Sequence, residues 1–193
     1  MDFLILSRAA DADDSDGTDD ADDNSALNEL HWAYMDGFAD GMTARGPTFD
    51  RAADTWTGSL HIVDLPGPDA PADFVAREPY QRAGRFRGHH VWRFTNLLGR
   101  TMWEFGRPPT EDRFFVVALG GTKPVPLVDL PEELAQGLIV YGTLHDLDDG
   151  PAGVALAVQA PSREALDALL ADPRTGLTQH EIAVHDWEFG GRR

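Results

Sequence analysis

The 193-residue chain contains no cysteine. Disulfide bonds, thiolate catalysis and cysteine-ligated zinc or iron–sulfur sites are therefore excluded. Basic residues are also scarce: 16 lysines and arginines stand against 33 aspartates and glutamates, which gives a net charge of −17. Nucleic acids and anionic membrane surfaces bind basic faces, so this charge balance predicts neither of them as a partner.

Long hydrophobic runs are missing as well. No apolar stretch approaches the roughly 20 residues needed to span a bilayer. The first ten residues have no basic segment and too short an apolar run for a signal peptide. We therefore expect a cytoplasmic protein. Apolar residues make up 42% of the chain and charged residues 25%, values typical of globular domains that bury a sizeable core.

The acidic residues are concentrated near the N-terminus. Residues 11–23 hold eight aspartates. Like charges repel, and this segment has nothing to bury, so it predicts a solvated loop inserted at about residues 10–25. Its aspartate spacing is similar to that of calcium loops, but the twelve-residue pattern ending in glutamate is absent. Cation binding by this loop is left open.

One pattern occurs twice in the chain. Glu78-Pro79 and Asp172-Pro173 each end a helix, because proline removes a hydrogen-bond donor and restricts the residue before it. Each pair is followed by a loop with glycine and by a strand ending in His-x-Trp-x-Phe, at residues 90–94 and 185–189. These and other landmarks recur at an offset of 95 positions: Gly58 and Gly153, Pro66 and Pro161, Ala70 and Ala165, His90 and His185, Trp92 and Trp187, Phe94 and Phe189.

The repeat predicts a tandem duplication, with copy one at residues 1–95, a connector at 96–113 and a degenerate copy two at 114–193. Each copy has the element order β, α, β, β, α, β. In copy one the helix is expected from Ala26 to about Ala44, with Ser25 as its cap and with a turn or short strand near Gly46. Its expected buried stripe is Leu27, Leu30, His31, Tyr34, Phe38 and Met42.

Alternation predicts a strand over residues 58–65. Leu60 and Ile62 fall on one of its faces, and Ser59 and His61 fall on the other. Two βαββαβ units are the ferredoxin-like arrangement, in which each antiparallel sheet carries both helices on one side. Two such units that cover each other's open faces would form an intrachain α+β barrel, a pseudo-dimer within one chain, with the final strands at the seam.

In its landmarks the chain resembles the YCII-related (YciI-like) family of the dimeric α+β barrel superfamily. The matching residues are the first strand FLIL, His31, Gly46-Pro47, Gly58-Ser59, Glu78-Pro79-Tyr80 with Ala83-Gly84, and in copy two Gly142, Gly153, Asp172-Pro173, Gly176-Leu177 and the Trp187 strand. The specificity of this resemblance lies in their order and spacing, since each motif is short.

The resemblance implies an acid–base dyad of His31 and Glu78, with Ser59 and Tyr80 binding substrate. This chain has glutamate where the family has aspartate, which leaves the contact with His31 in question. A neutral imidazole can take a proton near pH 7, and a carboxylate on its other nitrogen fixes the tautomer. His61 shares a strand face with Ser59, so it is a further candidate for substrate binding. The first helix of copy two has no histidine.

Simpler readings stand beside the dyad. His31 could be a core histidine bonded to a backbone carbonyl, and the whole barrel could be a non-catalytic module that binds a small molecule or a protein. The leading hypothesis is a lyase- or isomerase-type enzyme for a small molecule, without cofactor or metal. His90 and His185 could meet across the seam, but packing is the expected role. The chain is expected as a monomeric pseudo-dimer or as a homodimer.

Overall fold

The computed structural model describes residues 1–10, 21–120 and 124–190, and the side chains of residues 21–24 lie outside that description. The N-terminal half contains β1 (Asp2–Ala9), α1 (Ala21–Asp36), β2 (Met42–Asp50), β3 (Thr55–Asp64), α2 (Ala70–Arg77), α3 (Pro79–Arg82) and β4 (Phe86–Asn96). The C-terminal half contains β5 (Asp112–Leu119), α4 (Glu132–Gly137), β6 (Leu138–His145), β7 (Pro151–Ala160), α5 (Arg163–Leu170) and β8 (Glu181–Trp187).

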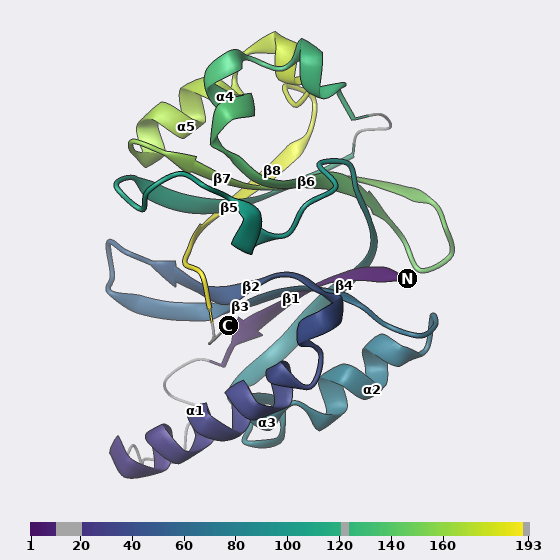
Figure 1. The fold of residues 1–193 in the computed structure, drawn as a ribbon, viewed down its shortest axis with the longest axis vertical. Helices are drawn as coiled ribbons and strands as arrows, with labels where there is room; N and C mark the ends of the chain where they lie inside the picture. The colour runs from purple at the N-terminus through teal and green to yellow at the C-terminus, as the bar shows by residue number, and fades with distance from the viewer. Residues whose placement is uncertain (11–20, 121–123, 191–193) are drawn as a thin grey trace.

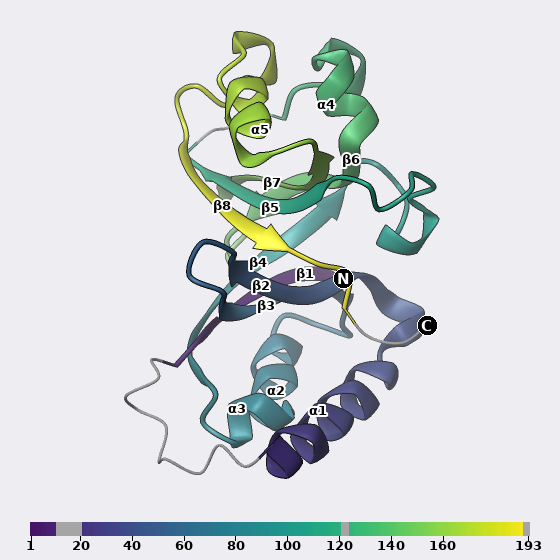
Figure 2. The same ribbon diagram turned by 90° about the vertical axis from the view of Figure 1, so that its left-hand side faces the viewer.

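The eight strands close into one antiparallel barrel in the order β1-β3-β2-β8-β5-β7-β6-β4. The two sheets face each other in the middle of the molecule, with α1 to α3 on the outer side of one and α4 and α5 on the outer side of the other (Figures 1 and 2). The expected fold of two ferredoxin-like units packed as an intrachain α+β barrel is confirmed. Within the described ranges, no helix has the length and apolar character needed to cross a membrane.

Alternation along the strands divides the core into three layers. Leu60 and Ile62 point into the barrel and pack with side chains from both halves, such as Phe115 and Trp187. Val63, on the opposite face of β3, packs under α1 and α2. A third apolar cluster fills the space between the second sheet and its helices. The predicted division of β3 into two faces is therefore seen in the structure.

The two sheets join at two seams, where β2 pairs with β8 and β6 pairs with β4. Each seam contains a glycine at which the two halves touch. A Cβ on Gly46 would lie 1.8 Å from the carbonyl oxygen of Glu188, and one on Gly142 would lie 2.4 Å from that of Thr95. Neither position has room for a side chain, which explains glycine at corresponding points of both second strands.

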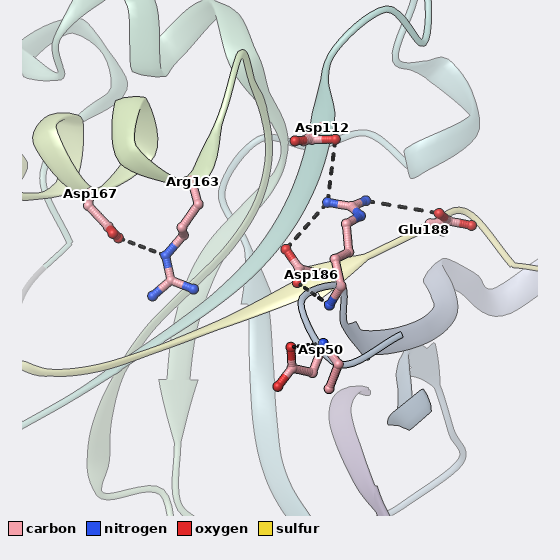
Figure 3. A network of polar contacts seen from close by, with 8 residues as sticks. Asp50, Asp112, Arg163, Asp167, Asp186 and Glu188 are labelled. Atoms are coloured by element: carbon pink, nitrogen blue, oxygen red, sulfur yellow. Dashed lines mark hydrogen bonds and ion pairs between the residues drawn. The ribbon is translucent and has the colours of Figure 1, made fainter. Parts of the chain in front are cut away.

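Ion pairs also cross the seams. In the turn after β2, Arg51 reaches the second half, with an Nη1 atom 3.3 Å from Asp186 and 3.5 Å from Asp112 (Figure 3). At the opposite seam, Asp149 in the turn after β6 pairs with Arg93 on β4. Each half thus uses the hairpin between its second and third strands to hold the other.

The first helix differs from the prediction at both ends. It begins at Ala21, before Ser25, and ends at Asp36, so the expected span to Ala44 is wrong. Met42 belongs to β2, a nine-residue strand that runs through Gly46 and Pro47, where a turn or short strand was expected. Leu30 is 61% exposed and lies outside the predicted buried stripe. The helical spacing was misleading, because Met42 of β2 falls by coincidence at the position that would continue the stripe.

Two further expectations changed. The final strands β4 and β8 are not neighbours in the barrel, so His90 and His185 do not share a seam; the His90 ring stacks instead on Trp92, with centroids 5.5 Å apart. Most of the predicted acidic loop, residues 11–20, lies outside the described residues. Its last part is helical, because α1 already starts at Ala21.

Candidate active site

A cavity of about 520 Å³ lies between α1 and the outer face of β2 and β3. Its walls are rich in rings, contributed by Trp32, Phe49, Trp56, Tyr80 and Phe189. The polar lining comes from Asn28, His31, Arg45, Ser59, His61 and Arg85. A concave site with apolar walls and a few convergent polar groups is typical of small-molecule binding sites.

His31 and Glu78 are in direct contact beside this cavity. Nδ1 of His31 lies 2.6 Å from Oε1 of Glu78, and their side chains are 12% and 4% exposed. Glu78 stands where α2 ends and α3 begins, and its Oε2 accepts the backbone N–H of Gln81 at 2.7 Å. One carboxylate therefore caps α3 and accepts the imidazole N–H, so the longer glutamate side chain preserves the contact. His31 itself lines the cavity.

Tyr80 fixes the plane of the His31 ring. The two rings stack with centroids 4.3 Å apart and an interplanar angle of 17°. The Tyr80 hydroxyl donates a hydrogen bond to Oδ1 of Asn28 on α1 at 2.6 Å, and burial raises the pKa of this phenol. Since its hydrogen is engaged by Asn28, Tyr80 presents mainly its ring to the cavity.

Ser59 and His61 lie on the same face of β3 and both line the cavity. His61 is 2% exposed, and its ring centroid is 5.9 Å from that of His31. Burial, reinforced by the nearby His31, Arg45 and His89, holds the pKa of His61 well below its ordinary value. Its Nδ1 is buried and has no hydrogen-bond partner within the described structure. His61 is thus a neutral imidazole with an unsatisfied polar atom at the cavity.

A chain of hydrogen bonds connects Glu78 to the sheet below it. Gln81, whose backbone donates to Glu78, lies with its Oε1 2.7 Å from Nε2 of His89. Nδ1 of His89 lies 2.8 Å from Oγ of Ser7 on β1. Burial lowers the pKa of His89, which favours the neutral ring that can donate from Nε2 and accept at Nδ1. Ser7, His89 and Gln81 thus form a hydrogen-bonded chain that holds Glu78 in position.

Sequence reasoning missed several of these residues. Ser7, Gln81 and His89 carry no motif that would have singled them out. Arg45 follows the expected helix and was not singled out, whereas it is a buried β2 residue, 3% exposed, with Nη2 3.1 Å from Asp36. The alternation of Arg45 with two small residues, Ala44 and Gly46, was the available signal for a strand.

The second half treats its acid-proline turn differently. Asp172 caps the short turn Pro173–Thr175 by accepting the N–H of Arg174, and it forms an ion pair with the same arginine at 2.7 Å. The hydrogen bonds from Arg174 lower the pKa of this solvent-facing carboxyl. Asp172 is therefore a structural turn residue. Across the described ranges, no group of three or more histidine or acidic side chains is placed to hold a metal ion.

Comparison with solved structures shows the fold. A protein provisionally assigned as a chlorite dismutase matches 97% of this chain over 94% of its own length, with 12% identity and a TM-score of 0.55. A provisionally assigned monooxygenase from Fusobacterium nucleatum matches 97% of this chain over 91% of its length, with 8% identity and a TM-score of 0.51. At these identities the likeness concerns the barrel alone.

A third structure matches only 52% of this chain but 99% of its own, with 23% identity and a TM-score of 0.41. It is the 5-chloro-2-hydroxyhydroquinone dehydrochlorinase of Burkholderia phenoliruptrix in complex with 2,5-dihydroxybenzoquinone. No curated protein matches the chain significantly. The family model for the YCII-related domain matches residues 1–95, the half that contains both His31 and Glu78. Residues 1–95 of the chain therefore form a YCII-related domain.

Proposed function

We propose that the cavity of the N-terminal half is the active site of a small-molecule enzyme of the lyase or isomerase type. The observation that carries this proposal is the 2.6 Å contact between Nδ1 of His31 and Glu78 at the wall of the 520 Å³ cavity. A structural histidine bonded to a backbone carbonyl, the simpler reading, would not need a buried carboxylate partner. An imidazole–carboxylate pair is the arrangement that general acid–base chemistry uses.

The chemistry follows from the tautomer. A carboxylate can only accept, so His31 donates its Nδ1–H to Glu78 and presents the lone pair of Nε2. That lone pair takes a proton from an acidic carbon or a hydroxyl of the substrate, and Glu78 stabilises the imidazolium that forms. The same proton then passes from Nε2 to another carbon of the intermediate in an isomerisation, or to the leaving group in an elimination.

The neighbouring residues would bind and orient the substrate. The Ser59 hydroxyl can donate to a substrate oxygen, and the neutral His61 offers a second polar contact from the same strand. Tyr80 holds the His31 ring in place and supplies a flat apolar surface. Arg45 and Arg85, which also line the cavity, favour a substrate with negative charge or one that develops it during proton removal.

The test is a screen for proton exchange. Small keto, hydroxy and carboxylic compounds are incubated with the protein in D2O, and proton NMR detects loss of carbon-bound hydrogen or formation of product. His31→Ala should lower the rate for any active compound by about 10²- to 10⁴-fold. Glu78→Gln should lower it less, because the shape is kept and only the charge is lost.

Asp172→Asn serves as the matched control and should leave the rate unchanged, since Asp172 lies in the corresponding turn of the other half and has no histidine partner. A rate that is unaffected by His31→Ala would refute the proposal. Binding without exchange, equally strong in the wild type and in His31→Ala, would favour the alternative of a non-catalytic binding module.

A further inference from the structure

The second half reaches the cavity of the first through its C-terminal tail. After β8 the chain continues along β2, where the Glu188 N–H donates to Pro47 O at 3.2 Å and the Gly190 N–H donates to Arg45 O at 3.0 Å. Figure 2 shows β8 leaving its own sheet and running down to the first half. These bonds extend the β2–β8 seam beyond the end of the strand, up to the wall of the cavity.

The two backbones meet there without intervening side chains. A Cβ on Gly190 would lie 2.5 Å from Cα of Gly46, and a Cβ on Gly46 would lie 2.8 Å from the Gly190 nitrogen. Gly46 has a φ of +157°, which a residue with a side chain rarely adopts. The tail therefore has a defined seat on β2, and its position relative to the cavity is set by close packing.

Phe189 stands between these two hydrogen bonds and lines the cavity. Its ring is held from the second half: the guanidinium carbon of Arg113 on β5 lies 4.0 Å from the ring centre, and the Trp187 ring lies 5.2 Å away. A cation over an aromatic face is an attractive contact that also restricts the ring. Phe189 is thus a fixed wall, although it comes from the end of the chain.

We propose that Phe189 closes the cavity of the N-terminal half and sets the size of the molecule it admits, so that the second half, without an acid–base pair of its own, completes the site. Phe189 lines the cavity in the structure; its role in substrate selection rests on the function proposed above. His61 is a suitable reporter, because it lines the cavity and pairs across the strands with Arg45, the residue whose carbonyl binds the tail.

The experiment measures access to the cavity and needs no substrate. Diethyl pyrocarbonate modifies neutral imidazoles, and mass spectrometry of peptides gives the rate at each histidine. The variants form a size series at one position: Phe189→Ala, Phe189→Leu and Phe189→Trp. His145 on β6 does not line the cavity and serves as the internal reference. Ile182→Ala, an exposed apolar residue on β8, is the matched control variant.

The rates at His61 and His31 should rise several-fold in Phe189→Ala, rise less in Phe189→Leu and fall below the wild type in Phe189→Trp. His145 should react at one rate throughout, and Ile182→Ala should behave as the wild type. If Phe189→Ala unfolds, the modification rate at His145 will rise as well. The Phe189→Leu and Phe189→Trp variants then test the inference. Equal His61 rates across the series would overturn the inference, even if His31→Ala still abolished turnover. Rates that follow the series while no proton exchange is found would instead count against the proposed function alone.

Discussion

The outer faces of the two sheets differ at corresponding positions. In the N-terminal half, β3 presents Ser59 and His61 to a cavity under α1. In the C-terminal half, 95 positions later, β7 presents Val154 and Leu156, which are 2% and 1% exposed and belong to an apolar cluster under α4 and α5. Corresponding positions of β3 and β7 therefore line a polar cavity in the N-terminal half and a packed apolar core in the C-terminal half.

The helices that cover the two sheets also differ. The first half has a 16-residue α1 that carries His31 over the sheet, whereas the second has only the six-residue α4 in the corresponding place. Glu78 turns inward to His31, while Asp172 pairs with Arg174 at the surface. The proposed site thus lies where the first sheet departs from close apolar packing, whereas the corresponding face of the second sheet is closely packed. The predicted tandem duplication would explain this pairing of positions, but it stays a prediction.

The largest effect is expected when a histidine, the residue at position 61 of β3, is placed at the corresponding position 156 of β7. Leu156→His puts an imidazole into a close-packed apolar cluster, where it has neither room nor a polar partner. We expect a loss of about 3 kcal/mol in the free energy of unfolding, measured by urea denaturation. A loss below about 1 kcal/mol would mean that the second sheet tolerates polar groups as the first does.

The reciprocal change sharpens the comparison. His61→Leu removes a buried nitrogen that has no partner in the described structure and replaces it by an apolar side chain of similar size. Stability should rise by about 1 kcal/mol, while proton exchange at the proposed site should weaken. A variant that is less stable than the wild type would show that His61 has a structural partner, such as bound water.

The pH dependence of stability gives an intermediate effect. Because burial depresses the pKa of His61 in the folded protein, the unfolded chain binds a proton as the pH falls through about 6.5 while the folded chain does not. Stability is therefore lost as the pH falls below that value. His61→Leu should lack this contribution, so its unfolding free energy should fall less steeply, by up to about 1.4 kcal/mol per pH unit.

Urea titrations of both proteins at several pH values between about 7 and 5 check this expectation. The depressed pKa of His89 contributes a slope of the same sign, but it is present in both proteins and cancels in the difference. Parallel curves for the wild type and His61→Leu would contradict a neutral, buried His61.

The sequence predicted the architecture better than the details of the site. The repeat of landmarks and the alternation of β3 led to two βαββαβ units in one barrel and to the two faces of that strand. Both signals are periodic and come from burial, which leaves a trace in the order of residues. The residues taken from the family resemblance, His31, Glu78, Ser59 and Tyr80, lie around one cavity together with His61, which was singled out by its strand face. Their roles stay a proposal.

What the sequence could not predict depended on contacts between distant elements. The end of α1 and the full extent of β2 were missed: only a turn or short strand was expected near Gly46, because Gly46 and Pro47 are poor strand residues. Glycine and proline fit these positions because backbone from the other half packs against them at the seam. Likewise His89 and Phe189 reach the site only through pairing that brings β1, β4 and the tail together. Local pattern carries no information about such neighbours.

The smallest effect is expected at the seam ion pairs, which test whether the two halves hold each other equally. Arg51 contacts Asp112, Asp186 and, at 3.9 Å, Glu188 from the second half, while Asp149 pairs with Arg93 in the other direction (Figure 3 shows the first set).

The Arg51 side chain is 35% exposed and that of Asp149 is 71% exposed, so solvent and salt screen both. Arg51→Ala should cost at most about 1 kcal/mol and Asp149→Ala less, with both losses fading in high salt. Urea denaturation at low and high salt measures them. A larger, salt-resistant loss for Arg51→Ala alone would show that the β2–β8 seam, which also seats the tail, depends on this arginine for more than charge, for instance through its position over the Phe114 ring.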